Sequence, residues 1–504
     1  MGSAYNIEKV NEALVRITSD DSGALMDLSE QFTFYADGYK FVPSYRNKLW
    51  DGKIRLWNSR YQTLPYGLMD HAVNFARKTG YAVNFSDELK ESEVPSKKEC
   101  LDFIDNLEIS LNGKKITPRD YQIESFCKIV REQRVLVVSP TGSGKSLIIY
   151  LAIRWFLENG DGKVIVIVPT TSLVEQMTKD FADYSSNDDG FDDDIDVHKI
   201  YSGKEKFNID AGVVVTTWQS AIKLPKDWFK QFGMSIGDEA HLFKAKSLNT
   251  IMGNLVNAKY RIGATGTLDD SVCNELTLVG NFGPVFNTIT TKELIENKTL
   301  AKLSINCIVC NHDDLLKKVV SKMDYKSEIA TIVEHPNRNS FISNLACDQK
   351  GNTLILFNYV KKHGKPLYEM IKEKAGDSRS VFYVSGEVKT EDREKVRELT
   401  EKETDVIIVA SSQVFSTGIN IKELHNIIFA APTKSQVRVL QSIGRGLRKS
   451  KHNKDTVVYD IADDFSWKKK VNHTMRHAKE RISIYIKQGF DYKIHKIELP
   501  YNET

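Results

Sequence analysis

The chain contains 504 residues, of which 70 are Lys or Arg and 67 are Asp or Glu, giving a net charge of +3. This length allows about three domains with sizeable cores, since typical domains hold roughly 100–200 residues. The small net charge excludes a basic surface over the whole chain, so any surface that binds a polyanion must be local. The sequence has no apolar run of the roughly 18 residues that a membrane helix needs, and its start lacks the apolar core of a signal peptide. We therefore expect a cytoplasmic protein without a membrane segment.

Six cysteines are spread through the chain, and only Cys307 and Cys310 have C-x-x-C spacing. No second pair of Cys or His lies at the distance that a zinc site requires. The two cysteines belong to the alternating segment 303–310, where residues three apart point to opposite faces of a strand. We expect buried, reduced thiols here rather than metal ligands.

Residues 1–95 are expected to form a small α+β domain, because helix-like and strand-like pieces occur there without a nucleotide-binding motif. Aromatic and basic side chains are interleaved over residues 35–66. Cations can neutralise phosphates, while aromatic faces stack on exposed bases or wedge between them. One interpretation is a nucleic-acid surface that includes Lys53, Arg55 and Trp57. The other is a small core with basic residues at its rim.

A first α/β domain is expected over residues 96–290, following a polar linker at 86–100. From about residue 115 apolar strands alternate with amphipathic helices, which is typical of parallel sheets covered on both faces. In such sheets ligands bind beyond the carboxyl ends of the strands. The strands are predicted at 134–139, 163–168, 212–217, 234–238 and 259–265.

The stretch Ser139 to Ser146 reads SPTGSGKS and directly follows an apolar run. A strand that leads into a glycine-rich loop and then a helix turns backbone N–H groups toward one point, where a polyphosphate can bind. The general pattern is G-x-x-x-x-G-K-[ST], and Ser139 replaces its first Gly. Lys145 is expected to reach the β- and γ-phosphates, and the Ser146 hydroxyl to hold Mg²⁺. The predicted nucleotide contacts are Pro140, Thr141, Gly142, Ser143, Gly144, Lys145 and Ser146.

An acidic pair and an upstream glutamine extend this site. Asp238 and Glu239 follow a predicted strand, where Asp238 suits a water-mediated Mg²⁺ ligand and Glu239 can polarise the attacking water. The pair could instead cap the next helix, but the P-loop upstream favours catalysis. Gln122, with Arg119 beside it, precedes the P-loop, and its amide offers the donor and acceptor that an adenine edge requires.

Other strand ends carry hydroxyl or amide side chains that suit sugar-phosphate contacts without base reading. Taken alone, each of these strand ends would be interpreted as an ordinary turn. The residues predicted to contact nucleic acid here are Thr170, Thr171, Thr217, Trp218 and Gln219, and the segment 265–267 reads TGT. The acidic segment 188–196 is expected to be a solvated loop that points away from any polyanion.

A second α/β domain is expected over residues 291–465, with strands at 353–357, 380–384, 405–409 and 426–430. It has no P-loop, so it cannot be an independent NTPase. Its distinctive stretches are 415–420, which includes Thr417, Gly418 and Asn420, and 441–449, which includes Gln441, Arg445 and Arg448. The two arginines lie three apart on an expected helix and could both reach a γ-phosphate. Residues 466–504 are expected to form a basic helical tail that either tracks phosphates or is merely solvated.

In order, these stretches resemble the motif series of the superfamily 2 helicases: Gln122, the P-loop, 168–173, the DEAH sequence at 238–241, TGT, 416–420 and QSIGRGLR at 441–448. The resemblance implies an α/β fold of two tandem RecA-like parallel-sheet domains, with ATP between them and nucleic acid across both. Lys145, Asp238 and Glu239 would come from one domain and Gln441, Arg445 and Arg448 from the other, acting as catalytic residues. The implied cofactors are ATP and Mg²⁺.

Within the superfamily, the whole chain resembles the UvsW family of recombination helicases of T4-type bacteriophages. The matching stretches are 36–39, 50–56, 216–219 and 414–419, together with the small N-terminal domain. The resemblance implies an ATP-dependent DNA helicase that acts on Holliday junctions, stalled forks, D-loops and R-loops in recombination, repair and replication control. It also implies branched DNA, single-stranded DNA and RNA–DNA hybrids as partners, and the host cytoplasm as location. We expect a monomer. The alternatives to a DNA helicase are an RNA helicase, or an ATP-switched nucleic-acid clamp that hydrolyses little ATP.

Overall fold

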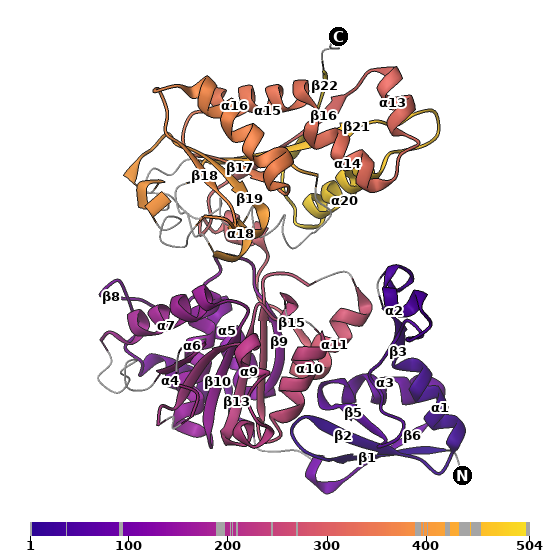
Figure 1. The fold of residues 1–504 in the computed structure, drawn as a ribbon. Helices are drawn as coiled ribbons and strands as arrows, with labels where there is room; N and C mark the ends of the chain where they lie inside the picture. The colour runs from indigo at the N-terminus through magenta and orange to yellow at the C-terminus, as the bar shows by residue number, and fades with distance from the viewer. Residues whose placement is uncertain are drawn as a thin grey trace. The chain divides into compact units, whose positions relative to one another are not determined.

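In the computed structural model the chain folds into two compact units (Figure 1). The first unit contains Met1–Ser139 and Gly144–Thr288, and the second contains Pro140–Ser143 and Ile289–Thr504. In the described part of the chain, no helix combines the length and apolar character needed to cross a membrane. The structure describes residues 3–499 except 37, 90–93, 188–196, 202, 204, 208–209, 243–244, 269–270, 389–394, 397, 401, 419–423, 433–443 and 445–454.

The N-terminal domain is a four-stranded mixed sheet with helices packed on it, as expected for a small α+β domain. The strand order is β5 (Thr63–Pro65), β2 (Leu14–Thr18), β1 (Ala4–Lys9) and β6 (Ala82–Phe85). Alternate residues of β1 and β2 enter the core, which also holds apolar residues of α1 (Ser22–Gln31) and α3 (Met69–Thr79).

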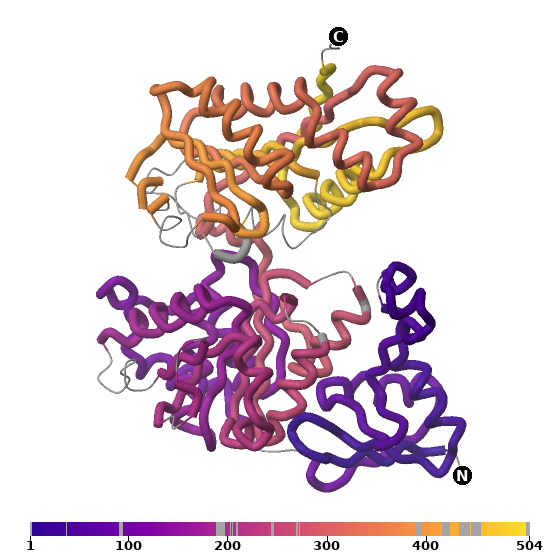
Figure 2. The backbone as a smooth tube through the Cα atoms, viewed as in Figure 1, coloured from indigo at the N-terminus to yellow at the C-terminus, as the bar shows by residue number. Residues whose placement is uncertain are grey.

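A second, two-stranded sheet extends from this domain as an arm, which we define as residues 33–55. Its strands β3 (Thr33–Tyr35) and β4 (Lys53–Arg55) pair antiparallel and enclose η1 (Tyr39–Phe41) and α2 (Pro43–Arg46). Figure 2 shows the arm, in indigo, running out from the domain and back. The base of the arm is tied to the domain core because Leu56 N–H donates to the Phe32 carbonyl, and both side chains are buried.

The N-terminal domain packs directly on the first RecA-like domain. Arg134, the first residue of β9, pairs with Glu12 at 2.5 Å and lies 4.1 Å from the centre of the Tyr66 ring. The backbone of Gly67 meets α11 so closely that an added Cβ would lie 2.0 Å from the Val279 carbonyl oxygen. These contacts join the N-terminal domain and the first RecA-like domain into one compact unit.

The first RecA-like domain contains a seven-stranded parallel sheet with helices on both faces. The helices on one face are α4 (Lys97–Asp105), α5 (Asp120–Glu132), α6 (Lys145–Asn159) and α7 (Thr171–Ser185), and on the other α9 (Trp218–Ala221), α10 (Ala245–Asn254) and α11 (Val272–Phe282). The strand order is β11 (Val197–Ile200), β12 (Val213–Thr217), β10 (Lys163–Val168), β13 (Phe232–Asp238), β14 (Tyr260–Thr265), β9 (Arg134–Val138) and β15 (Val285–Asn287). All five predicted strands are present. Helix α4 begins inside the stretch predicted as linker, because Ser96 and Glu99 form a capping box.

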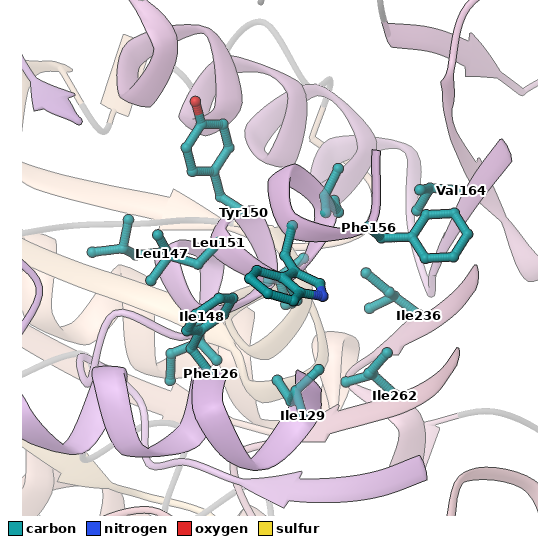
Figure 3. Packing of buried hydrophobic residues seen from close by; sticks show 14 of the residues in the cluster. Phe126, Ile129, Leu147, Ile148, Tyr150, Leu151, Phe156, Val164, Ile236 and Ile262 are labelled. Atoms are coloured by element: carbon teal, nitrogen blue, oxygen red, sulfur yellow. The ribbon is translucent and has the colours of Figure 1, made fainter. Parts of the chain in front are cut away.

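Helix α6 is the central element of this core. Residues Leu147 to Phe156 are all buried, so the helix is covered on every side. Figure 3 shows Leu147, Ile148 and Leu151 of α6 near Phe126 and Ile129 of α5, in a cluster that also includes strand residues. A helix fixed this firmly holds the backbone of its first residue, Lys145, in one place.

The second RecA-like domain repeats the pattern in another seven-stranded parallel sheet. Helices α15 (Pro336–Asp348) and α16 (Lys365–Ala375) share a core cluster with one face of the sheet, and α20 (His473–Lys487) packs with Val309 and Ala462. The further helices are α12 (Thr291–Glu296), α13 (Asp314–Val320), α14 (Tyr325–Glu334) and α18 (Ser412–Gly418). The strand order is β18 (Val381–Val384), β19 (Ile407–Ser411), β17 (Thr353–Phe357), β20 (Asn426–Phe429), β21 (Thr456–Asp464), β16 (Leu303–Asn311) and β22 (Tyr492–Glu498).

The C-terminal residues differ from the expected basic helical tail, because only part of them is helical and that part packs on the second domain. Strand β22 pairs with β16 and completes the sheet. Arg481 of α20 is buried and forms a 2.7 Å ion pair with Asp460, because a buried guanidinium needs a carboxylate partner. Glu328 of α14 accepts hydrogen bonds from the backbone N–H groups of His473 and Thr474, which fixes the start of α20.

Cys307 and Cys310 lie on β16 as buried free thiols, as predicted. Burial raises the pKa of Cys307 to about 12, so this thiol stays protonated at neutral pH.

Replacement of Gly67 by Ala should destabilise the unit, because the new methyl group would meet the backbone of α11. We expect the free energy of unfolding to fall by about 2 kcal/mol, measured by urea denaturation. Gly253→Ala is the matched control: nothing lies within 4 Å of its added Cβ, and the change should be neutral or slightly stabilising. Equal stability of the two variants would contradict the close packing at Gly67.

Candidate nucleotide site

Three neighbouring strands bring the main motifs together. β13, β14 and β9 are adjacent and parallel, so the residues that follow their carboxyl ends meet at one edge of the sheet. Ser139 N–H donates to the Thr265 carbonyl at 2.8 Å, which joins the start of the P-loop to the TGT segment. Asp238 lies opposite Ala264 in the register, one residue before Thr265.

The P-loop turns through two glycines in the left-handed region, Gly142 at φ 86° and Gly144 at φ 79°. Gly144 caps α6, and an added Cβ there would lie 2.4 Å from Gln122 Nε2. Gln122 therefore packs against the loop, as its distance in the sequence suggested. Its Oε1 accepts a hydrogen bond from Arg119 N–H at 2.9 Å, which closes the first turn of α5. The Arg119 guanidinium donates to the Tyr121 hydroxyl at 3.1 Å.

Lys145 pairs with both acidic residues. Its Nζ lies 3.0 Å from Asp238 Oδ1 and 2.8 Å from Glu239 Oε1. Burial disfavours the charge on Lys145, but the two carboxylates outweigh this effect and raise its pKa. Burial raises the pKa of Asp238, whereas for Glu239 the attraction of Lys145 exceeds the effect of burial and lowers the pKa. The lysine thus compensates two carboxylates that would otherwise repel each other in a poorly solvated site.

Glu239 has a strained backbone and a buried carboxylate oxygen close to His241. Its φ of 49° is unusual for a residue other than glycine, and such strain is often stored at functional sites. Its Oε2 is buried and lies 3.5 Å from His241 Nδ1. His241 Nδ1 lies 2.6 Å from Thr265 Oγ1, which connects the DEAH sequence to TGT. A carboxylate held in this way is suited to accept a proton from a water molecule.

Ser146 contacts a residue that the sequence did not indicate as part of the site. Its hydroxyl lies 2.9 Å from the hydroxyl of Tyr184 on α7. Burial raises the pKa of Tyr184 to about 12, so this side chain is neutral and can donate to Ser146. Tyr184 occurs at helical spacing with Val174, Met177 and Phe181, a pattern that indicates only a core position.

The oxygen donors at this edge of the sheet fit a hard divalent cation. Asp238 is the last residue of β13, Glu239 follows it, and the Ser146 hydroxyl lies in the first turn of the helix that follows β9. Oxygen ligands of this kind are those that Mg²⁺ prefers.

Several strand-end residues have structural roles. Thr170 Oγ1 accepts from Leu173 N–H and caps α7, and Thr217 Oγ1 accepts from Ser220 N–H and caps α9. Gln219 Nε2 donates to the Pro169 carbonyl at 3.2 Å, which joins the two strand ends. Thr171 is exposed, and Trp218 packs partly on the core. The nucleic-acid contacts of these residues stay predictions.

The motifs of the second domain are only partly described. Thr417 and Gly418 form the end of α18. Four predicted site residues lie outside the described residues: Asn420, Gln441, Arg445 and Arg448. The acidic segment 188–196 lies outside them as well.

Lys53 and Arg55 lie in the arm, whereas Trp57 follows it and is buried in the domain core. Lys53 Nζ lies 5.3 Å from the centre of the Tyr35 ring. Arg55 pairs with Asp51 at 2.5 Å, and this hydrogen bond lowers the pKa of Asp51 to about 2. Trp57 is only 4% exposed and belongs to the core of the N-terminal domain. The structure therefore favours the core interpretation for Trp57, because a buried side chain cannot stack on bases and its apolar area stabilises the small domain.

Comparison with known proteins gives a consistent result across the whole chain. Three family models match: "DNA helicase UvsW, N-terminal" over residues 8–86, "Type III restriction enzyme, res subunit" over 115–270, and "Helicase conserved C-terminal domain" over 337–450. The ATP-dependent DNA helicase uvsW of Enterobacteria phage T4 is 37% identical over 502 residues, covering 96% of this chain and 98% of that protein. A crystal structure of T4 UvsW matches with 35% identity and a TM-score of 0.53, covering 99% of this chain and 100% of that one. A second T4 UvsW structure covers 57% of this chain and 100% of its own, with 36% identity and a TM-score of 0.52.

Replacement of Lys145 by Ala should make stability depend on pH. Without the lysine, burial and mutual repulsion raise the pKa values of Asp238 and Glu239 in the folded state above their unfolded values. The pair then favours the folded state at low pH, and this contribution is lost as the pH rises through the folded pKa values. We expect the variant to be less stable than the wild type by about 3 kcal/mol near pH 7, and by clearly less at about pH 5, in urea denaturation.

Lys128→Ala is the control for this experiment, because Lys128 forms only an exposed pair with Glu132 at 3.1 Å. Its stability should stay within about 0.5 kcal/mol of the wild type. A Lys145→Ala deficit that is the same at both pH values would show that Lys145 does not compensate the acidic pair.

Proposed function

This chain belongs to the UvsW family of superfamily 2 ATP-dependent DNA helicases, and we propose that it uses ATP hydrolysis to remodel branched DNA. The substrates would be Holliday junctions, stalled forks, D-loops and R-loops in phage recombination, repair and replication control. One observation carries the catalytic part of the proposal: Lys145 sits between Asp238 and Glu239 at the strand ends beside the P-loop. The branched-DNA part is supported by the extent of the similarity, which includes the N-terminal domain.

ATP binding would change the partner of Lys145. The backbone N–H groups of residues 140–146 would hold the phosphates, and Lys145 would exchange its carboxylate partners for phosphate oxygens of similar charge. Gln122 would contact the adenine beside Gly144, with Arg119 nearby. The second domain would add Gly418 and Asn420 to the nucleotide contacts.

Hydrolysis would follow from the release of the acidic pair. Once Lys145 binds phosphate, Glu239 is free to accept a proton from the attacking water. Asp238, through water, and Ser146, held by Tyr184, would bind Mg²⁺, which neutralises phosphate charge when it is bound. Gln441, Arg445 and Arg448 would stabilise the charge that develops on the γ-phosphate, a role worth roughly 10³–10⁵ in rate for such arginines.

DNA would be gripped by its backbone. The candidate contacts are Thr170, Thr171, Thr217, Trp218, Gln219 and Thr417 at strand ends, and Lys53 and Arg55 in the arm. Phosphate contacts carry little sequence information, so binding should show little base preference. Affinity should fall by about 0.7 to 0.9 log units per log unit of salt for each phosphate neutralised.

Replacement of Glu239 by Gln should reduce DNA-stimulated ATP hydrolysis by about 100-fold or more while ATP still binds, because the amide cannot accept the proton of water. Steady-state phosphate release and a fluorescent ATP analogue measure the two quantities. Glu158→Gln, at a half-exposed position on α6, should leave both unchanged. Hydrolysis at the wild-type rate in Glu239→Gln would remove Glu239 from the reaction.

The substrate class is tested by ATP-dependent dissociation of a synthetic Holliday junction beside a linear DNA duplex and an RNA duplex of matched length. We expect the junction to be processed at least about 10-fold faster than either linear substrate. Equal or faster action on RNA would keep the motor and reject the proposed substrate. ATP binding without turnover on any substrate would instead favour an ATP-switched clamp.

A further inference from the structure

The arm exposes apolar side chains to an extent found nowhere else in the described residues. Leu49 is 81% exposed and Phe41 is 76% exposed, the two highest values among the large apolar side chains that the structure describes. Tyr35 is 54% exposed on the same arm. Exposed apolar groups gathered on one projection commonly mark an interaction site.

The exposed side chains are carried by a rigid base. Tyr39 stacks on Tyr35 with 4.6 Å between ring centres and packs edge-on against Tyr45 at 4.8 Å. Gly52 lies beneath the Tyr39 ring, where an added Cβ would be 2.5 Å away, and Trp50 Nε1 donates to the Lys53 carbonyl at 3.0 Å. Phe41 and Leu49 are therefore presented on a folded platform, and little conformational entropy would be lost when they bind.

The arm is also the most suitable place in this domain for a polyanion. Residues 33–55 contain five basic and two acidic side chains, while the whole chain has a net charge of only +3. Lys40, Arg46 and Lys48 are exposed on the same arm, and Lys40 and Lys48 directly precede Phe41 and Leu49 in the sequence. Asp51 does not oppose them, because Arg55 neutralises it.

This combination identifies the kind of partner. An apolar tip flanked by cations matches the end of a DNA duplex, where apolar base faces lie between two phosphate backbones. An apolar protein partner or an uncharged lipid surface would leave the flanking charges without counterparts. An anionic lipid surface would pair with them, but the chain belongs to a family of DNA helicases, so DNA is the polyanion that the proposal takes.

We propose that the arm is a wedge that contacts the branch point of DNA, with Phe41 and Leu49 stacked against the terminal bases and Lys40, Arg46 and Lys48 on the flanking phosphates. The inference deepens the proposed function and rests on it. A wedge must be attached firmly to the motor, and the Glu12–Arg134 pair and the Gly67 contact provide this attachment. Arg134 begins the strand that leads into the P-loop.

The test compares wild type with the double variant Phe41→Ala/Leu49→Ala, on a fork that carries 2-aminopurine at the branch point. Both side chains are exposed, so the fold should be unaffected. Without ATP, wild-type binding should raise the 2-aminopurine fluorescence by unstacking the probe, and the double variant should lose most of this rise. With ATP, the double variant should open the fork about 10-fold more slowly, while its ATPase on linear single-stranded DNA stays within about 2-fold of wild type.

Met26→Ala is the matched control, since Met26 is 66% exposed on α1 of the same domain but lies outside the arm. It should behave as wild type in every assay, and Phe41→Leu should keep most of the fluorescence rise because leucine is also an apolar side chain that can wedge between bases. An unchanged fluorescence rise in the double variant would overturn the wedge. Absence of DNA-stimulated ATPase in wild type would overturn the proposed function instead, and the ATP-free fluorescence would still decide the role of the arm.

Discussion

The ion pairs of Lys145 with Asp238 and Glu239 are the interaction on which the rest of the site depends. Two carboxylates next to each other, poorly solvated at the end of a sheet, can both stay ionised only if a cation lies between them. The same cation is the one that a phosphate would attract most strongly. On the proposed function, nucleotide binding would break the contact that holds this site together, and this would link binding to the release of Glu239.

The surrounding fold keeps this contact in place. Helix α6 starts at Lys145 and is buried through ten successive residues, so the backbone of Lys145 is held by the core while its side chain can change partners. Asp238 is the last residue of β13, and Glu239 follows it with a positive φ and pairs with Lys145. On the other side of the unit, Arg134 anchors the N-terminal domain at the beginning of β9, the strand that ends at the P-loop. The arm and the nucleotide site thus share one rigid support.

The sequence predicted regular elements and chemical motifs better than it predicted tertiary roles. Strands β10 and β17 have the expected bounds, since continuous apolar runs between turns indicate buried parallel strands. Tyr184 was not identified, because a tyrosine at helical spacing looks the same whether its hydroxyl is idle or contacts Ser146. Trp57 and Arg481 occur in basic or aromatic stretches that suggest a surface, yet both are buried, and burial is decided by partners distant in sequence. For the same reason, the exposure of Phe41 and Leu49 was visible only in the folded arm.

The most direct test of this account is steady-state ATP hydrolysis by wild type and Lys145→Ala, each with and without DNA. The account predicts that DNA stimulates hydrolysis by the wild type and that the variant has no activity in either condition, although it remains folded at about pH 5 to 6. Hydrolysis that persists in the variant would contradict the account, because the lysine between the two carboxylates would then not be the residue that binds the phosphate.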